Sequence, residues 1–180
     1  TWSPVGSAKT ADFPGPLRVG VAAFASAGSA GPVATFDFLR VDLTQPETIW
    51  DGDEFDATAL DRHRWVVHHE VPAEWEIGGG GLTITTAQGD FWRWRDDARN
   101  LFLQRAPDED FLVQTQVNFT PLANYEQAML MLWRDHNNFA KLSTVYDNGP
   151  RIEAAIEIEG VYSNESIVNP FGSDVLLGIE

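Results

Sequence analysis

The chain has 180 residues, a length that suits one large all-β domain or one domain joined to a fragment of another. Twelve basic and twenty-seven acidic residues give a formal net charge of −15, which excludes nucleic acids and anionic membrane surfaces as partners because both attract basic proteins. The chain contains no cysteine, which excludes disulfides, thiolate metal sites and thiol nucleophiles. No apolar stretch approaches the length of a membrane span.

Short runs of alternating apolar and polar residues follow one another along the chain and predict β-strands. In the clearest run, 111–119, Gln114 and Gln116 alternate with apolar residues and are expected to face away from the core. The expected strands span residues 17–24, 34–43, 65–69, 82–86, 101–104, 111–119, 128–134, 139–146 and 151–159. Turn signals separate them, four glycines at 78–81 among them, and no amphipathic helix of three turns is found. The pattern predicts an all-β, antiparallel sandwich or barrel.

Several motifs, each weak alone, occur in an order that resembles a known family. They are "DEFDATALDRHRW" (53–65), "GGLTI" (80–84), "NLFLQ" (100–104), "FLVQTQV" (111–117), "NYEQAMLMLW" (124–133) and "DHNNFAKL" (135–142). In this order they are similar to the concanavalin A-like domains at the C-termini of bacterial β-xylosidases and related glycoside hydrolases. The resemblance implies a two-sheet, concanavalin A-like jelly roll in a secreted, extracellular bacterial protein. The chain has neither an initiator Met nor a signal peptide, and we expect it to be an excerpt of a longer protein.

The N-terminal segment resembles the end of the same family, so the strand order is permuted or the sandwich incomplete. "TWSPVGS" (1–7), "LRVGVAAF" (17–24) and "ATFDFLRV" (34–41) resemble the family's closing strands. We therefore divide the chain into closing strands (1–43), a connector (44–52), and opening and middle strands (53–180). Residues 1–43 are either the tail of a preceding repeat or a part that docks onto the main body. Because an open edge and an exposed apolar face are costly, we favour docking.

The loop "GDFWRWRDD" (89–97) is one candidate for carbohydrate binding. Trp92 and Trp94 are expected to project to one side of an extended segment, with Arg93 and Arg95 on the other. A Trp ring offers a flat face for a sugar, and polar neighbours bind its hydroxyls. The alternative is that both Trp side chains cap the core.

Polar and aromatic residues on the strands are a second candidate. Side chains that leave the core in alternation are expected to line one face of a sheet and to bind saccharide, unless that face is merely solvated. With the nearby Tyr125, they are Gln114, Gln116, Gln127, Trp133, Lys141 and Tyr146.

Acidic residues at the two ends of the family's sandwich are a candidate for a structural Ca²⁺. The resemblance implies that the strand carrying Asp37 adjoins the segment carrying Asp53 and Glu54. Carboxylate oxygens suit calcium. The alternative is that these side chains are solvated or cap turns.

Two further groups carry little weight as sites. Glu153, Glu157 and Glu159 share one strand face, which we expect to be solvated because their spacing does not match a sandwich-type hydrolase motif. His68 and His69 are consecutive in a predicted strand, so we expect them to face opposite ways and not to share a metal.

The sequence thus favours a non-catalytic module that binds a polysaccharide or oligosaccharide, or shapes a neighbouring catalytic pocket, next to other domains of its parent protein. The alternatives are a sandwich-fold glycoside hydrolase that uses paired carboxylates such as Glu153 and Glu157, and a purely structural spacer.

Overall fold

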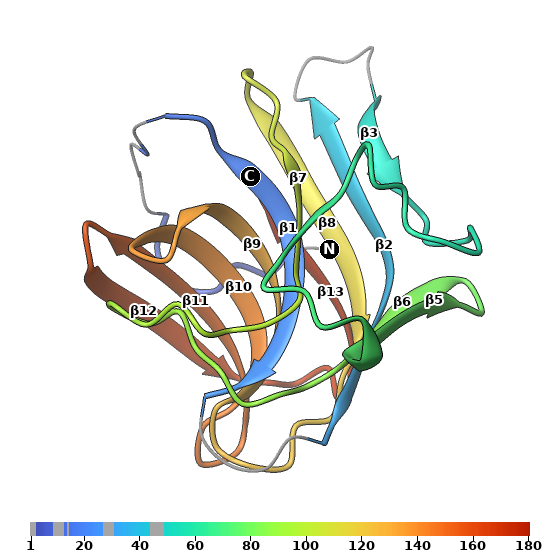
Figure 1. Ribbon diagram of the computed structural model, residues 1–180. Helices are drawn as coiled ribbons and strands as arrows, with labels where there is room; N and C mark the ends of the chain where they lie inside the picture. The colour runs from blue at the N-terminus through green and yellow to red at the C-terminus, as the bar shows by residue number, and fades with distance from the viewer. Residues whose placement is uncertain (1–2, 9–12, 14, 27–30, 44–48) are drawn as a thin grey trace.

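In the computed structural model, the chain folds into two antiparallel β-sheets (Figure 1). The structure describes residues 3–8, 13, 15–26, 31–43 and 49–180. The large sheet has the strand order β12-β11-β10-β9-β1-β7-β4. Its strands are β1 (Arg18–Ala25), β4 (Val66–His68), β7 (Leu101–Arg105), β9 (Glu126–Asp135), β10 (Asn138–Tyr146), β11 (Pro150–Ile158) and β12 (Val161–Val168). The prediction of an all-β, antiparallel two-sheet sandwich is confirmed.

The small sheet has the order β13-β8-β2-β6-β5, and β3 pairs with β2 beside this path. Its strands are β2 (Val33–Leu43), β3 (Ile49–Asp53), β5 (Trp75–Gly78), β6 (Gly81–Thr85), β8 (Phe111–Asn118) and β13 (Asp174–Ile179). The glycine run predicted as a turn joins β5 to β6, and Gly79 and Gly80 both adopt positive φ there. One 3₁₀ turn, η1 (Pro72–Glu74), precedes β5.

Strands from the first 43 residues lie in the middle of both sheets. β1 pairs with β9 along its full length and with β7 on its other side. β2 lies between β8 and β6. At Gly20 of β1 a Cβ would overlap the carbonyl oxygen of Phe102, so the close approach of β1 to β7 requires glycine. The structure therefore places β1 and β2 inside the two sheets, whereas the division at residues 43, 52 and 53 stays a prediction.

The main core fills the space between the sheets. Alternation places Val113, Thr115 and Val117 of β8 inward, as predicted, while Gln114 and Gln116 point outward. Large side chains from both sheets and from the segments next to their strands meet in this layer, among them Phe36, Phe55, Trp65, Phe102 and Phe119. A second apolar cluster lies on the other face of the large sheet, and it positions the candidate site.

Four strands were not predicted from the sequence: β3, β5, β12 and β13. β12 has the sequence VYSNESIV, which lacks clean alternation because it pairs with β11 alone, at the edge of the large sheet. Residues 1–2 of the N-terminal motif and 44–48 of the connector lie outside the described residues. Among the described residues, no helix has the length and hydropathy that a membrane span would need.

Removing residues 1–48 tests the role of the two central strands. We expect a chain of residues 49–180 to show no cooperative thermal unfolding, because the deletion separates β9 from β7 and β8 from β6. Circular dichroism melting and the dispersion of amide NMR signals, compared with the full chain, measure this. A transition close to that of the full chain would show that β1 and β2 are dispensable.

Candidate functional site

The outer face of the large sheet is covered by the segment 86–100, here called the covering loop. Its Phe91 is buried and packs edge-to-face on Phe24, Trp133 and Phe139, with ring centroids 5.0, 5.2 and 4.6 Å away. Such aromatic contacts add to the burial of apolar area. Phe91 therefore anchors the loop on the sheet.

Trp133, predicted to bind sugar, is part of this anchor. Its side chain is 3% exposed and packs between Phe91 and Phe139. The ring has no open face for a ligand, so here the structure corrects the expectation of an exposed platform.

Two aspartates shape the covering loop. Asp90 Oδ1 accepts hydrogen bonds from the backbone N–H groups of Phe91 (2.8 Å) and Trp92 (2.9 Å). Asp97 Oδ1 accepts from Asp90 N, and the carbonyl of Asp90 accepts from the N–H groups of Asp97 and Ala98. Arg95 forms an ion pair with Asp97 at 2.9 Å, and this pair lowers the pKa of the Asp97 carboxyl. These bonds hold both ends of the loop's tip together.

Residues 92–95 form a tight turn, here called the aromatic turn. Arg95 N donates to the Trp92 carbonyl, and Arg93 has φ +58°. The Arg93 guanidinium lies 4.4 Å from the Trp92 ring centroid and 5.9 Å from that of Trp94. The expectation of an extended segment with Arg93 on the opposite side is therefore wrong, because the left-handed residue reverses the chain.

The two Trp rings differ in exposure. Trp94 is 78% exposed and Trp92 is 42% exposed. Trp92 leans edge-on toward Tyr162 of β12 at 6.3 Å, which accounts for its partial burial. Trp94 thus presents an open aromatic face, and neither ring caps the core.

A buried ion pair lies beside the aromatic cluster, on the same sheet face. Lys141 Nζ is 2.9 Å from Glu153 Oε1 and donates to Gln127 Oε1 at 2.5 Å. Glu153 also accepts hydrogen bonds from Tyr162 Oη (3.1 Å) and Asn164 Nδ2 (2.8 Å). Burial acts to raise the pKa of Glu153, but Lys141 and the two donors outweigh it, so the pKa is lowered. Burial and Glu153 together raise the pKa of Tyr162.

Glu157 lies four residues further along β11 and is fully buried. Its Oε2 accepts a hydrogen bond from Arg93 N at 3.0 Å, and its Oε1 has no hydrogen-bond partner among the described residues. Burial raises the pKa of Glu157, and the nearby Asp90 adds to the rise. The expectation of a solvated face is therefore wrong for Glu153 and Glu157, because residues of the covering loop and β12 cover them, Glu157 fully and Glu153 to 14% exposure.

The two carboxylates do not suit glycoside hydrolysis. Four residues of a strand span about 13 Å, whereas paired glycosidase carboxyls lie about 5 to 9.5 Å apart. Glu153 is neutralised by Lys141, and Glu157 is inaccessible.

The other residues predicted for carbohydrate binding lie elsewhere. Gln114 and Gln116 face outward from the small sheet, on the opposite side of the sandwich, and Gln116 donates to Asp174. Tyr125 N bonds to the Tyr146 carbonyl at the end of β9 and β10 far from Trp133. Lys141 and Gln127 contact each other on the outer face of the large sheet, Trp133 packs under the covering loop, and Trp92 and Trp94 lie in that loop, whereas the other four residues lie elsewhere.

The three acidic residues predicted for calcium do not form a ligand set. Asp53 accepts hydrogen bonds from Trp65 Nε1 (2.7 Å) and Phe55 N (2.9 Å). Glu54 forms a bidentate ion pair with Arg40, at 2.8 and 3.0 Å, and Arg40 lowers its pKa. Asp37 is exposed in the β2 bulge. Calcium takes six to eight oxygen ligands, the carboxylates of Asp53 and Glu54 already serve donors, and the three residues do not cluster, so they do not fit the ion.

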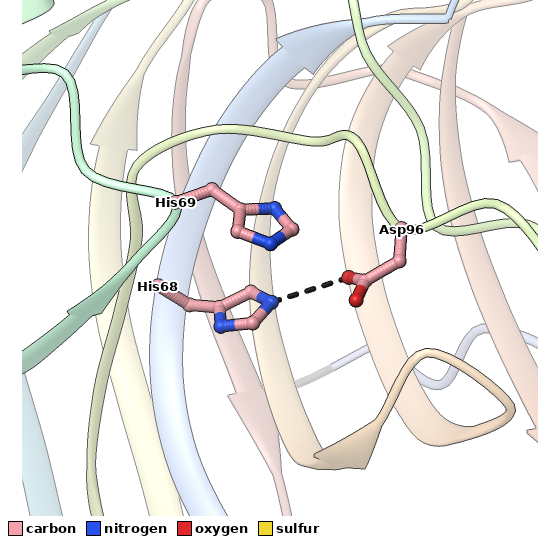
Figure 2. Close-up of side chains that lie close together, drawn as sticks. All are labelled: His68, His69 and Asp96. Atoms are coloured by element: carbon pink, nitrogen blue, oxygen red, sulfur yellow. Dashed lines mark hydrogen bonds and ion pairs between the residues drawn. The ribbon is translucent and has the colours of Figure 1, made fainter.

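His68 and His69 lie together, although the sequence pattern predicts that they face opposite ways. β4 ends at His68, and His69 adopts φ +49°, so the two rings stack with centroids 3.9 Å apart. Figure 2 shows both rings on the side that faces Asp96. Among the described residues, these three form the one group of His, Cys, Asp or Glu side chains with the proximity of metal ligands.

Comparison with known proteins gives one match. A family model described as the beta xylosidase C-terminal concanavalin A-like domain matches residues 52–178. No curated protein and no solved structure matches the chain significantly.

Replacing Lys141 with Met tests the buried ion pair. We expect a loss of about 3–5 kcal/mol in the free energy of unfolding at pH 7, because Glu153 keeps a buried charge without its cation. Urea denaturation measures the loss. Adding Glu153→Gln should recover part of it. Arg105→Met, which breaks an exposed ion pair with Asp108, is the control and should cost less than about 1 kcal/mol.

Replacing Glu157 with Gln tests its raised pKa. Folding favours protonated Glu157, so the wild type loses stability relative to the variant as pH rises through the raised pKa. For each unit by which folding raises the pKa of Glu157, the wild type loses about 1.4 kcal/mol of its free energy of unfolding at high pH. Thermal unfolding of both proteins from pH 4 to pH 8 measures the difference, in which the opposite contribution of Glu153 cancels. A difference independent of pH would contradict the assignment.

Proposed function

Because the chain belongs to the family of β-xylosidase C-terminal concanavalin A-like domains, we propose that it is a non-catalytic module that binds carbohydrate through the aromatic turn. In this proposal it works outside a bacterial cell, next to the other domains of a glycoside hydrolase-type protein. Trp94 is the platform on which a sugar ring stacks, and Arg93 and Trp92 flank it.

The exposure of Trp94 is the observation that carries the proposal. An indole that is 78% exposed retains little of the free energy of apolar burial. The backbone that carries it is nevertheless held in place, because Phe91 anchors the loop and Asp90 accepts from two consecutive N–H groups. An aromatic side chain on a fixed backbone binds a ligand with a smaller loss of conformational entropy than one on a mobile loop.

Polar groups next to the ring support binding of a hydroxyl-rich ligand. The Arg93 guanidinium lies close to both indoles and carries donors in a fixed plane. Its backbone N–H bonds to Glu157, which fixes the turn on the sheet.

The net charge favours neutral glycans. A surface with a charge of −15 repels acidic polysaccharides and leaves neutral ones unaffected. The state of Glu153 and Glu157 supports a role in binding rather than in hydrolysis, since one carboxylate is paired and the other is buried.

Affinity electrophoresis in gels that contain xylan, arabinoxylan or polygalacturonate tests the proposal. We expect the neutral polymers to retard the full chain and polygalacturonate not to. Trp94→Ala should weaken the binding at least about tenfold, or about 1.4 kcal/mol. The control is Phe171→Ala, which removes an exposed aromatic ring from the segment between β12 and β13 and should change nothing. Equal retardation of Trp94→Ala and the wild type would refute the role of the aromatic turn.

A further inference from the structure

Three of the four histidines in the chain gather around one carboxylate, that of Asp96. His68 Nε2 is 3.2 Å from Asp96 Oδ1, and His136 Nδ1 is 3.7 Å from Asp96 Oδ2. His69 stacks on His68. These residues come from three separate segments: the end of β4, the covering loop, and the turn between β9 and β10.

The proton on His69 is assigned by its neighbour. Its Nδ1 is 3.1 Å from the carbonyl oxygen of Ala98. A carbonyl only accepts hydrogen bonds, so Nδ1 carries the proton and Nε2 keeps its lone pair. Ala98 is itself buried, and its N–H donates to the Asp90 carbonyl, so this acceptor is held in place. A ring whose second nitrogen donates to a fixed carbonyl is the usual arrangement of a metal-ligating histidine.

The backbone of His69 supports the same conclusion. The left-handed conformation, φ +49°, is disfavoured for a non-glycine residue, and here it turns the second imidazole to the side of the first. If His69 continued the strand, the ring would face away from Asp96. The strained conformation therefore produces the juxtaposition of the two rings and the carboxylate (Figure 2).

We propose that His68, His69 and Asp96 bind a divalent transition metal of the Zn²⁺ class. One ligand atom from each of the three residues lies within 4.8 Å of the others. Ligands at 2.0–2.1 Å from a tetrahedral ion are about 3.3 Å apart, a separation that His68 Nε2 and Asp96 Oδ1 already have. The remaining adjustment, at most about 1.5 Å, is within reach of side chains that are partly exposed.

The donor set decides the class of metal. Two imidazoles and one carboxylate suit Zn²⁺, Co²⁺, Ni²⁺ or Cu²⁺, whereas calcium takes oxygen ligands. Three protein ligands leave at least one position for water or another ligand, and the exposure of His68 (33%) and Asp96 (38%) gives solvent access to it. His136 Nδ1 lies 3.7 Å from the second oxygen of Asp96, as a neighbour of the carboxylate rather than as a ligand.

The metal would join β4 to the covering loop, which also carries Trp92 and Trp94. The site uses none of the residues assigned to the sugar, so the inference goes beyond the proposed function and does not depend on it.

Isothermal titration of the full, untagged and EDTA-treated chain with ZnSO₄ tests the proposal. We expect one equivalent of Zn²⁺ to bind, and CaCl₂ to give no heat above the buffer blank. His68→Gln, His69→Gln and Asp96→Asn should each weaken Zn²⁺ binding at least about tenfold. His63→Gln is the matched control, because His63 lies outside the cluster and is exposed. Circular dichroism of each variant checks that it is folded.

Imidazole NMR of the wild type gives a readout that needs no variant. With only four histidines, ¹⁵N-edited spectra should show the Nε2 signals of His68 and His69 shifting on addition of ZnSO₄, the Nδ1–H of His69 retained, and His63 unchanged. Absence of Zn²⁺ binding would overturn the proposal. So would binding that persists in the His68→Gln, His69→Gln double variant, or that His63→Gln removes.

Discussion

The hydrogen bonding of β1 and β2 to a neighbour on each side is the constraint on which the rest of the structure depends. Each sheet is continuous only through one of these strands. β1 also supplies Ala22 and Phe24 to the outer face of the large sheet, where Phe24 packs edge-on against Phe91. The N-terminal segment therefore supports the core between the sheets and also forms part of the floor under the covering loop.

Two carboxyl groups on this face have pKa values shifted in opposite directions because their surroundings differ. Glu153 and Glu157 lie on the same side of β11, yet Lys141 lowers the pKa of the first and burial raises that of the second. Glu153 also receives hydrogen bonds from Tyr162 and Asn164, which ties the edge strand β12 to β11 through side chains as well as backbone. The ion pair between Lys141 and Glu153 favours one pairing of β10 with β11. A slip of one strand by one residue would leave the charge of Glu153 without its cation.

The sequence predicts the strands better than it predicts the site. Strict alternation identified 111–119, because one face of β8 is buried and the other is not. On β11 the same alternation gives a wrong prediction. It assigns the face of Glu157 to solvent, but the covering loop buries Glu157. The pairing of Lys141 with Glu153 depends on the register of two strands, and the family resemblance did not reveal that Arg40 and Trp65 occupy the carboxylates of Glu54 and Asp53.

The position of His69 is an example of a feature that local sequence patterns do not predict. The rule that consecutive strand residues face opposite ways holds only while the backbone stays extended, and no Gly, Asn or Asp marks the left-handed turn that His69 makes. In the covering loop, by contrast, a few hydrogen bonds and buried side chains account for the exposure of the residues between them. Phe91 and Ala98 are buried on the two sides of the loop's tip, and the Asp90 and Asp97 bonds hold these two sides together. The residues between Phe91 and Ala98 therefore point away from the sheet. The same few bonds leave both Trp94 and Asp96 exposed to solvent. A ligand that fixes either side chain therefore acts on the segment that positions the other.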